Sequence, residues 1–443
     1  MFFQKAVIFS ALITSSYADR STVSLNFGWR AAPAASTPPI CTVNYTISLN
    51  NQRCMGLSSL SATDPTSCAA AACTAFMQGW QWLEGQGCWA GLTNNCGPSG
   101  DAWVGAASPT IPTPLPPPAN APEAQPSYDD SNWEIVDIPH DSEINGQFAP
   151  NNNGGEGFQP LVVSWYRKHF IAPSVWKDNA VYLVVDAALS TTTWWLNGKQ
   201  IAIQNPAGYL PFVIRLDGNG LLTNDTTHNI LVALCDGTET TGWWREGAGL
   251  IRTARLVVSS STASISPMGI SSPSFIQGSI HPNGGATPAE GLFADLVVFN
   301  PSVTTFGNTG GLTATFTLYA ADDKTVVASG TSQEGRAGDT LTLKDPIYIT
   351  GPVQLWSVAR PYLYTLTVSL SVGGSTTDTT SEWVSFRSIT WDGERGLILN
   401  EQNVKMRGAC NHETFTGVGA AIPDRIDLLR VQQLRGVGMN AWR

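Results

Sequence analysis

TTTWWLNGKQIAI, residues 191–203, shows the pattern that recurs through much of this chain: a run rich in Thr and Trp, an Asn-Gly turn signal, and a second apolar run. Similar runs occur on both sides of it, separated by Asn-Gly, Asp-Gly or Pro. These runs are WYRKHFIA (165–172), AVYLVVDAAL (180–189), GYLPFVIRL (208–216), HNILVALC (228–235) and LIRTARLVV (250–258). Residues 128–258 are therefore predicted to form a sandwich of short antiparallel strands.

A second block, residues 272–385, has the same style and predicts a second, smaller sandwich, with runs such as LTATFTLYAAD (312–322) and YLYTLTVSL (362–370). The pattern changes after Arg387. VKMRGA (404–409) is a compact strand, and MNAW (439–442) begins another. Between them, a helix is predicted to open at Pro423 and Asp424 and to close at Gly436 and Gly438. This βαβ order is typical of the opening of a parallel α/β fold such as a TIM barrel.

The composition limits what the protein binds. The 443 residues suffice for three or four domains, and only 13% of them are charged. The chain contains 24 Lys and Arg but 34 Asp and Glu. We therefore expect no basic stripe that would neutralise the charge of a nucleic acid or of an anionic membrane surface. No HExxH, P-loop or GxGxxG motif stands in a suitable context, so we expect no metal and no cofactor.

The N-terminus predicts secretion. Lys5 precedes an apolar run, residues 6–13, and Ser16-Tyr17-Ala18 has the small-x-Ala form of a signal-peptidase site. Residues 1–18 are therefore interpreted as a signal peptide, since the run is well short of the ~20 apolar residues that span a bilayer. In a secreted chain, the sequons at Asn44 and Asn224 are candidate glycosylation sites.

Six of the eight cysteines fall close together and predict a small disulfide-stapled module over residues 41–105. They are Cys41, Cys54, Cys68, Cys73, Cys88 and Cys96. Their pairing stays open, and a zinc site is the rival interpretation, although the segment lacks a CxxC pair and a His. The two isolated cysteines, Cys235 and Cys410, are expected to be buried thiols.

The module interrupts a domain. Residues 19–40 hold a strand-like pattern, TVSLNFGWR (22–30), and are predicted to supply the first strand or strands of the larger sandwich. Residues 106–126 form a Pro-rich linker that leads back to that sandwich. The module itself contains three tryptophans, which form either its small core or a platform on which sugar rings stack. They are Trp80, Trp82 and Trp89.

Nine stretches in this order resemble family 2 glycoside hydrolases, the group of β-galactosidases, β-glucuronidases and β-mannosidases. They are FGWR (27–30), YDDSNWEIVDIPHD (128–141), SWYRKHF (164–170), LNGKQIAIQNPAGYLPFVIRL (196–216), TGWWREGAGLIR (241–252), WSVARPYLYTLTV (356–368), SEWVSFRSITWD (381–392), VKMRGACNHE (404–413) and MNAWR (439–443). The resemblance covers almost the whole chain apart from the cysteine module and its linkers.

The resemblance implies a mostly β chain of three domains. These are a sugar-binding jelly roll over 127–262, an immunoglobulin-like sandwich over 268–387, and the start of a (β/α)8 TIM barrel over 388–443. The activity implied is that of a secreted retaining exo-β-glycosidase similar to β-galactosidase, with a carbohydrate substrate. In the family, both catalytic glutamates lie on later barrel strands. No catalytic residue is therefore assigned within this chain, and we expect it to be inactive alone.

Three residues of the barrel portion are implied to line the substrate pocket. His412 and Glu413 match the His-Glu that follows the family's first barrel strand, and Arg443 matches the Arg that ends its second strand and supports the nucleophile. The alternatives are a His hydrogen-bonded within a loop and an Arg facing solvent.

Three residues of the larger sandwich, Trp243, Trp244 and Arg245, occupy a loop that in the family packs toward the barrel and shapes the pocket. Either tryptophan could stack on a sugar ring, and the arginine could bind a carboxylate. The alternative for this loop is packing between domains.

A second function stays open, namely an extracellular lectin-like protein that binds carbohydrate without hydrolysing it. The sugar that is recognised and the oligomeric state are not decided by the sequence.

Overall fold

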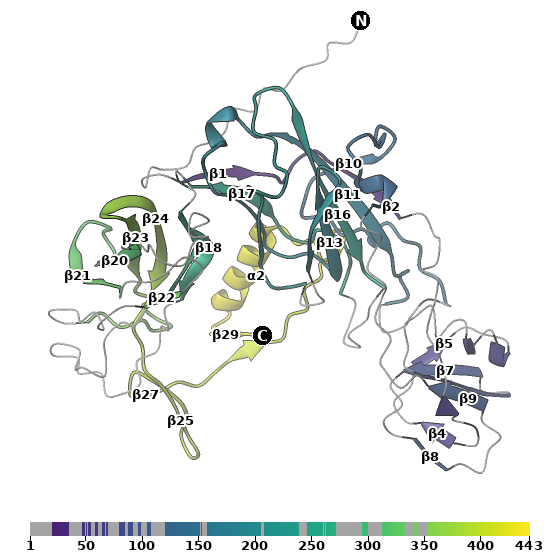
Figure 1. Cartoon of the computed structure of the whole chain (residues 1–443). Helices are drawn as coiled ribbons and strands as arrows, with labels where there is room; N and C mark the ends of the chain where they lie inside the picture. Colours follow the sequence, from purple (N-terminus) through teal and green to yellow (C-terminus); the bar gives the residue numbers. More distant parts are fainter. Residues whose placement is uncertain are drawn as a thin grey trace, which may run out of the picture.

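In the computed structural model the chain folds into two β-sandwiches, a small β module and a C-terminal α/β segment (Figure 1). The larger sandwich is called the first sandwich, and the smaller one the second sandwich. The structure describes residues 20–34, 120–150, 152, 157–204, 208–238, 246–259, 261, 263–271, 295–299, 312–332, 340–342 and 353–443, with shorter pieces between 47 and 107.

The first sandwich consists of two antiparallel sheets. One has the order β1 (Ser21–Ser24), β17 (Ala254–Val258), β12 (Val181–Val185) and β15 (Phe212–Arg215). The other has the order β10 (Glu134–Val136), β2 (Trp29–Pro33), β11 (Val163–Ile171), β16 (His228–Asp236), β13 (Thr191–Leu196) and β14 (Lys199–Gln204).

The core of the first sandwich lies between these sheets and is largely aliphatic, with Trp29, Trp194 and Tyr166 fully buried. Apolar residues alternate with polar ones where a strand faces solvent on one side, whereas β12 is buried along its whole length. The residues before the cysteine module supply one strand to each sheet, because β1 pairs with β17 and β2 pairs with β10 and β11. The module is therefore inserted into the chain of this sandwich.

A fully buried arginine anchors the segment that leads back from the module. Arg167 on β11 donates from Nε to the carboxylate of Asp130 at 2.9 Å, and its Nη1 donates to the carbonyl oxygens of Glu123 and Gln125. Glu123 lies in the short helix η1 (Pro122–Ala124), and Gln125 and Asp130 follow it. One side chain thus satisfies several backbone carbonyls that have no strand partner, which holds this irregular segment against the sheet.

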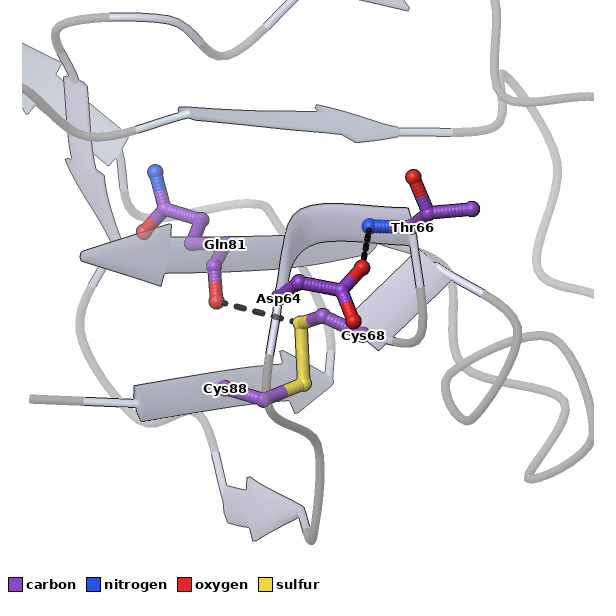
Figure 2. Close-up of a disulfide and its surroundings, with 5 residues drawn as sticks. All are labelled: Asp64, Thr66, Cys68, Gln81 and Cys88. Atoms are coloured by element: carbon purple, nitrogen blue, oxygen red, sulfur yellow. Dashed lines mark hydrogen bonds between the residues drawn. A yellow bond between two sulfur atoms is a disulfide. The ribbon is translucent and has the colours of Figure 1, made fainter. Parts of the chain in front are cut away.

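The module is a small sheet in the order β3 (Ile47–Ser48), β9 (Val104–Ala107), β6 (Gly79–Leu83), β7 (Gly87–Gly91) and β5 (Ser58–Leu60). A second pair, β4 (Gln52–Cys54) and β8 (Cys96–Pro98), accompanies it. A disulfide joins Cys68 to Cys88, and the Cys68 sulfur lies 3.4 Å from the carbonyl oxygen of Gln81 (Figure 2).

The described residues contain this one bridge, so they do not support the predicted framework of several disulfides. Cys41 and Cys73 lie outside the described residues, as do the side chains of Cys54 and Cys96, although the backbones of the last two are register partners.

The second sandwich pairs a three-stranded sheet with a four-stranded one. The first has the order β18 (Ser264–Ser271), β19 (Asp295–Phe299) and β22 (Thr340–Thr342). The second has the order β21 (Val326–Thr331), β20 (Leu312–Tyr319), β23 (Tyr364–Val372) and β24 (Ser375–Val384). Phe316, Leu366 and Val368 are fully buried between them.

The C-terminal segment begins with a small sheet of β25 (Ile389–Asp392), β26 (Gly396–Leu399) and β27 (Gln402–Asn403). It continues with β28 (Gly408–Ala409), the helix α2 (Asp424–Gly436) and β29 (Ala441–Trp442), and β28 and β29 pair in parallel. The predicted βαβ unit is therefore confirmed, and α2 begins and ends close to the predicted residues.

The prediction of a mostly β chain is confirmed, with α2 as the long helix of the described residues. The prediction that Cys410 is buried is wrong, because this residue is exposed directly after the short strand β28, whereas Cys235 on β16 is buried as predicted. None of the helices in the described part of the chain is long and apolar enough to cross a membrane.

A buried ion pair ties the two sandwiches together. Asp378 on β24 is fully buried and accepts hydrogen bonds from Nε and Nη2 of Arg20, which precedes β1, and from the amide of Ile265 on β18 at 2.7 Å. Nearby, the hydroxyl of Tyr182 on β12 lies 2.6 Å from that of Ser264. The N-terminal strand of one sandwich is therefore held to both sheets of the other.

Removal of one member of this pair should be costly, because it leaves a buried charge uncompensated. We predict that Asp378→Ala lowers the free energy of unfolding by about 3–5 kcal/mol, measured by urea denaturation. Arg395→Ala, which breaks an exposed pair with Asp392 at 3.6 Å, is the matched control and should cost less than about 1 kcal/mol. Equal effects of the two substitutions would contradict this interpretation of the junction.

Candidate active site

The parallel strands β28 and β29 bring the three predicted barrel residues to one edge. The amide of Asn411 donates to the carbonyl of Arg443 at 2.7 Å, and the amide of Arg443 donates to the carbonyl of Ala409 at 3.1 Å. His412 and Glu413 follow β28, and Arg443 follows β29, so all three lie at the carboxyl ends of the two strands. His412 and Arg443 are exposed, and Glu413 is partly exposed.

The loop that follows β28 contacts the first sandwich through an ion pair. Nη2 of Arg252 lies 3.0 Å from Oε2 of Glu413, and both side chains are a little under half exposed. Arg252 stands just before β17. Because both groups are hydrated, the pair orients the loop more than it stabilises it.

The buried part of the same loop is fixed by Asp141. Its Oδ2 accepts a hydrogen bond from the amide of Ala420 at 2.8 Å. Its Oδ1 accepts bonds from the amides of Glu143 at 3.0 Å and Ala248 at 3.3 Å. One carboxylate that is only 1% exposed therefore bonds to backbone on both sides of the junction. The methyl group of Ala420 packs beside it against a small apolar cluster formed by Ala187, Leu189 and Ile251.

Two glycines allow this close approach. Gly247 has φ +77°, and a Cβ there would lie 2.7 Å from the Cβ of Ala420 and 2.8 Å from Oδ2 of Asp141. Gly249 has φ +108°, and a Cβ there would lie 2.2 Å from the Tyr166 hydroxyl oxygen. Both the backbone conformation and the space exclude a side chain at these positions.

A histidine and a tyrosine support this junction from the first sandwich. His140 Nδ1 lies 2.8 Å from the hydroxyl of Tyr166, and the amide of His140 donates to the carbonyl of Leu250 at 2.8 Å. Burial lowers the pKa of His140, although the negative charges of Glu134 and Asp141 act in the opposite direction. Burial also raises the pKa of Tyr166 well above its ordinary value, so the pair is neutral at physiological pH.

The remaining predicted pocket residues, Trp243, Trp244 and Arg245, lie outside the described residues, and the prediction for them stays a prediction. The described residues contain no group of three or more His, Cys, Asp or Glu side chains that could hold a metal ion. Asp141 is unsuited to attack a substrate, because it is buried and its two oxygens bond to three amides. Glu413 offers a carboxylate that is accessible at the carboxyl edge of β28.

Comparison with known proteins shows which family the chain is similar to. The sequence profile of glycosyl hydrolases family 2 matches residues 300–387. The β-galactosidase BoGH2A of Bacteroides ovatus is 27% identical over 327 residues, which are 72% of this chain and 36% of that protein. A putative β-glucuronidase of Formosa agariphila is 26% identical over 319 residues, 72% of this chain and 28% of its own length. This chain is therefore similar to glycoside hydrolases of family 2.

Solved structures share the fold of this chain. A β-glycosidase from Bacteroides vulgatus matches 72% of this chain with a TM-score of 0.59 and 27% identity, over 39% of its own length. A β-glucuronidase from Bacteroides uniformis shares the fold over 96% of this chain with a TM-score of 0.64 and 18% identity, again over 39% of its length. The chain thus spans well under half the length of these relatives.

The sequence did not reveal the residues that hold the junction together. Asp141 and His140 stand in a stretch that resembles the family, and so do Gly247, Gly249 and Arg252, but the sequence around them predicts no role for any of these residues. The Ala420 amide lies 279 positions from Asp141, so no local pattern joins the two. The one local signal for this junction was the pair of glycines in GAGLIR (247–252), since glycines in a strand-like run mark a close approach of two backbones.

The lowered pKa of His140 predicts a pH dependence of stability. In the unfolded chain His140 has its ordinary pKa of 6.5, so it is protonated at a higher pH than in the folded chain. The free energy of unfolding is therefore highest above pH 6.5 and decreases as the pH falls from 6.5 toward the lowered pKa of the folded state. We predict a steeper fall in melting temperature between pH 7.5 and 5.5 for the wild type than for His140→Gln. Gln stays neutral and can still bond to Tyr166. The same slope in both proteins would show that His140 is not the group responsible.

Proposed function

We propose that this chain is part of a secreted retaining exo-β-glycosidase that hydrolyses O-glycosidic bonds of β-galactosides or related β-glycosides. One observation carries the proposal: His412, Glu413 and Arg443 gather at the carboxyl ends of the parallel strands β28 and β29. In TIM-barrel enzymes the active site lies at this end of the strands. The names of the relatives, β-galactosidase and β-glucuronidase, support the substrate class.

The proposal assigns a role to each part of the chain. The first sandwich is a sugar-binding jelly roll, the second is an immunoglobulin-like domain, and β28, α2 and β29 are the first βαβ unit of a (β/α)8 barrel. The pocket lies where the barrel edge meets the first sandwich. Glu413 lines it, held by Arg252, and Arg443 stands where it can support a nucleophilic carboxylate.

A retaining mechanism needs two carboxyl groups about 5–5.5 Å apart, one as acid and one as nucleophile. Among the described residues at this edge, Glu413 is accessible and Asp141 is committed to backbone amides. The helix α2 contains no buried residue, so its apolar side, which includes Leu429 at 50% exposure, lacks the packing that a closed barrel provides. We therefore propose that residues 1–443 alone are inactive and that both catalytic glutamates lie on further barrel strands.

Secretion and glycosylation are part of the same proposal. The signal-peptide interpretation of residues 1–18 rests on sequence pattern alone. Asn224 is partly exposed in the loop before β16, where its Oδ1 accepts hydrogen bonds from the amides of Thr226 and Thr227. This geometry fixes the carbonyl of the amide and suits a sequon on the protein surface.

The lectin-like function remains a second candidate because of the module's tryptophans. Trp80 is buried, which favours the core interpretation for it, whereas Trp82 and Trp89 on neighbouring strands are half-buried. Loss of glycan retention after joint substitution of Trp82 and Trp89 would favour this candidate.

The glycosidase proposal predicts a difference between two proteins. The chain of residues 1–443 should hydrolyse none of the nitrophenyl β-galactoside, β-glucuronide and β-mannoside substrates above the buffer rate. The full gene product, with any sequence that follows these residues, should hydrolyse at least one. Nuclear magnetic resonance of the first sugar released should show the β-anomer, because the mechanism retains configuration.

Each part of the proposal can fail separately. Turnover by residues 1–443 would refute the proposed inactivity. A full gene product that hydrolyses none of the three substrates would refute the glycosidase assignment, and release of the α-anomer first would refute retention.

A further inference from the structure

The outer face of the second sandwich is lined with hydroxyl groups. Along β20, Ala314, Phe316 and Leu318 are buried in the core, so the residues that alternate with them face outward. The strands β23 and β24 alternate in the same way, with Leu366 and Asp378 buried. The outward residues of β20, β23 and β24 form three rows: Tyr319, Thr365 and Trp383; Thr317, Thr367 and Ser381; and Thr315, Ser369 and Thr379.

Hydrogen bonds order the hydroxyls within these rows. The hydroxyls of Thr367 and Ser381 lie 2.8 Å apart, and that of Thr379 donates to that of Ser369 at 3.2 Å. Thr365 donates to the carboxylate of Asp323 in the turn between β20 and β21. The rows themselves carry no charged side chain, and each hydroxyl can both donate and accept. The three rows are therefore polar, uncharged and ordered, and the carboxylates of Asp323 and Glu382 lie beside them.

Two aromatic rings stand at one end of this face. Trp383 on β24 is 77% exposed, and Tyr319 on β20 is partly exposed in the same row, on the far side of β23. Because neighbouring strands lie about 4.8 Å apart, the two backbones are separated by roughly 10 Å. A shallow depression of about 230 Å³ adjoins the indole and is lined by Thr365, Ser381, Glu382 and Trp383.

This combination matches the chemistry of a neutral sugar chain. The apolar face of a pyranose ring packs on an indole or phenol ring, and its equatorial hydroxyls need donors and acceptors in the ring plane. The separation of the two backbones is comparable to the length of two sugar rings in a β-linked chain, so the two aromatics match a sugar and the next but one along the chain. We propose that this face of the second sandwich binds a neutral polysaccharide, with Trp383 and Tyr319 stacking on two sugars of one chain that are separated by a third sugar.

Other occupants fit less well. A protein interface needs a continuous desolvated core, whereas the rows outside the two rings are Ser and Thr. A nucleic acid needs cations along its backbone, and the rows contain none. The proposed site lies on β20, β23 and β24 of the second sandwich, whereas the proposed pocket lies where the first sandwich contacts the C-terminal segment through Asp141 and Arg252. The labelled strands of the two sandwiches can be followed in Figure 1. The inference therefore does not rest on glycosidase activity.

The test is native affinity electrophoresis of the whole chain in gels that contain β-1,4-galactan, β-1,4-mannan or β-1,3-glucan. At least one of these polysaccharides should retard the wild type. Trp383→Ala should weaken that retardation about tenfold, as expected for loss of one stacking ring, and Trp383→Tyr should restore most of it. Trp391→Ala is the matched control, since Trp391 on β25 is 68% exposed but lies in another sheet.

The proposal stands if retardation depends on Trp383 and not on Trp391. Absence of retardation by all three polysaccharides overturns it. So does retardation that Trp383→Ala leaves unchanged, because binding would then belong to another part of the chain, such as the cysteine module. Equal loss in Trp383→Ala and Trp383→Tyr also overturns it, since stacking would not be the interaction.

Discussion

The carboxylate of Asp141 joins the first sandwich to the C-terminal segment, and the geometry of the candidate pocket depends on it. It accepts hydrogen bonds from the amides of Glu143 and Ala248 on one side of the junction and from the amide of Ala420 on the other. A buried carboxylate is stable only when several donors replace its water, and here three backbone amides do so. The glycine at position 247 leaves the space this arrangement requires.

Buried charges recur wherever the chain must hold an irregular segment or join two parts. Arg167 fixes the segment that leads back from the module, and Asp378 fastens Arg20 and β18 together. Each is paired and hydrogen-bonded to backbone, which offsets its loss of hydration. Ordinary apolar packing forms the two sandwich cores, whereas these polar contacts determine how the pieces meet. The exposed pair of Arg252 and Glu413 then orients the loop that follows β28.

The sequence predicted the elements that depend on local pattern. The strand runs of both sandwiches and the helix after Pro423 follow from alternation, turn residues and capping, so they could be predicted without knowledge of the fold. The contacts that position the site could not be predicted in this way, because they join residues such as Asp141 and Ala420 that are far apart in the chain. Cys410 shows the same limit: its apolar neighbours in sequence suggested burial, but the end of a short strand leaves it exposed.

Hydrogen exchange at the Ala420 amide tests the central role of Asp141 most directly. Loss of the acceptor removes a hydrogen bond to a charged group, which is worth about 1.5–3 kcal/mol. Exchange in Asp141→Ala should therefore be at least about tenfold faster than in the wild type. Asp178→Ala, at an exposed position before β12, should leave the rate unchanged. An Ala420 amide that exchanges equally slowly in Asp141→Ala and the wild type would contradict the account.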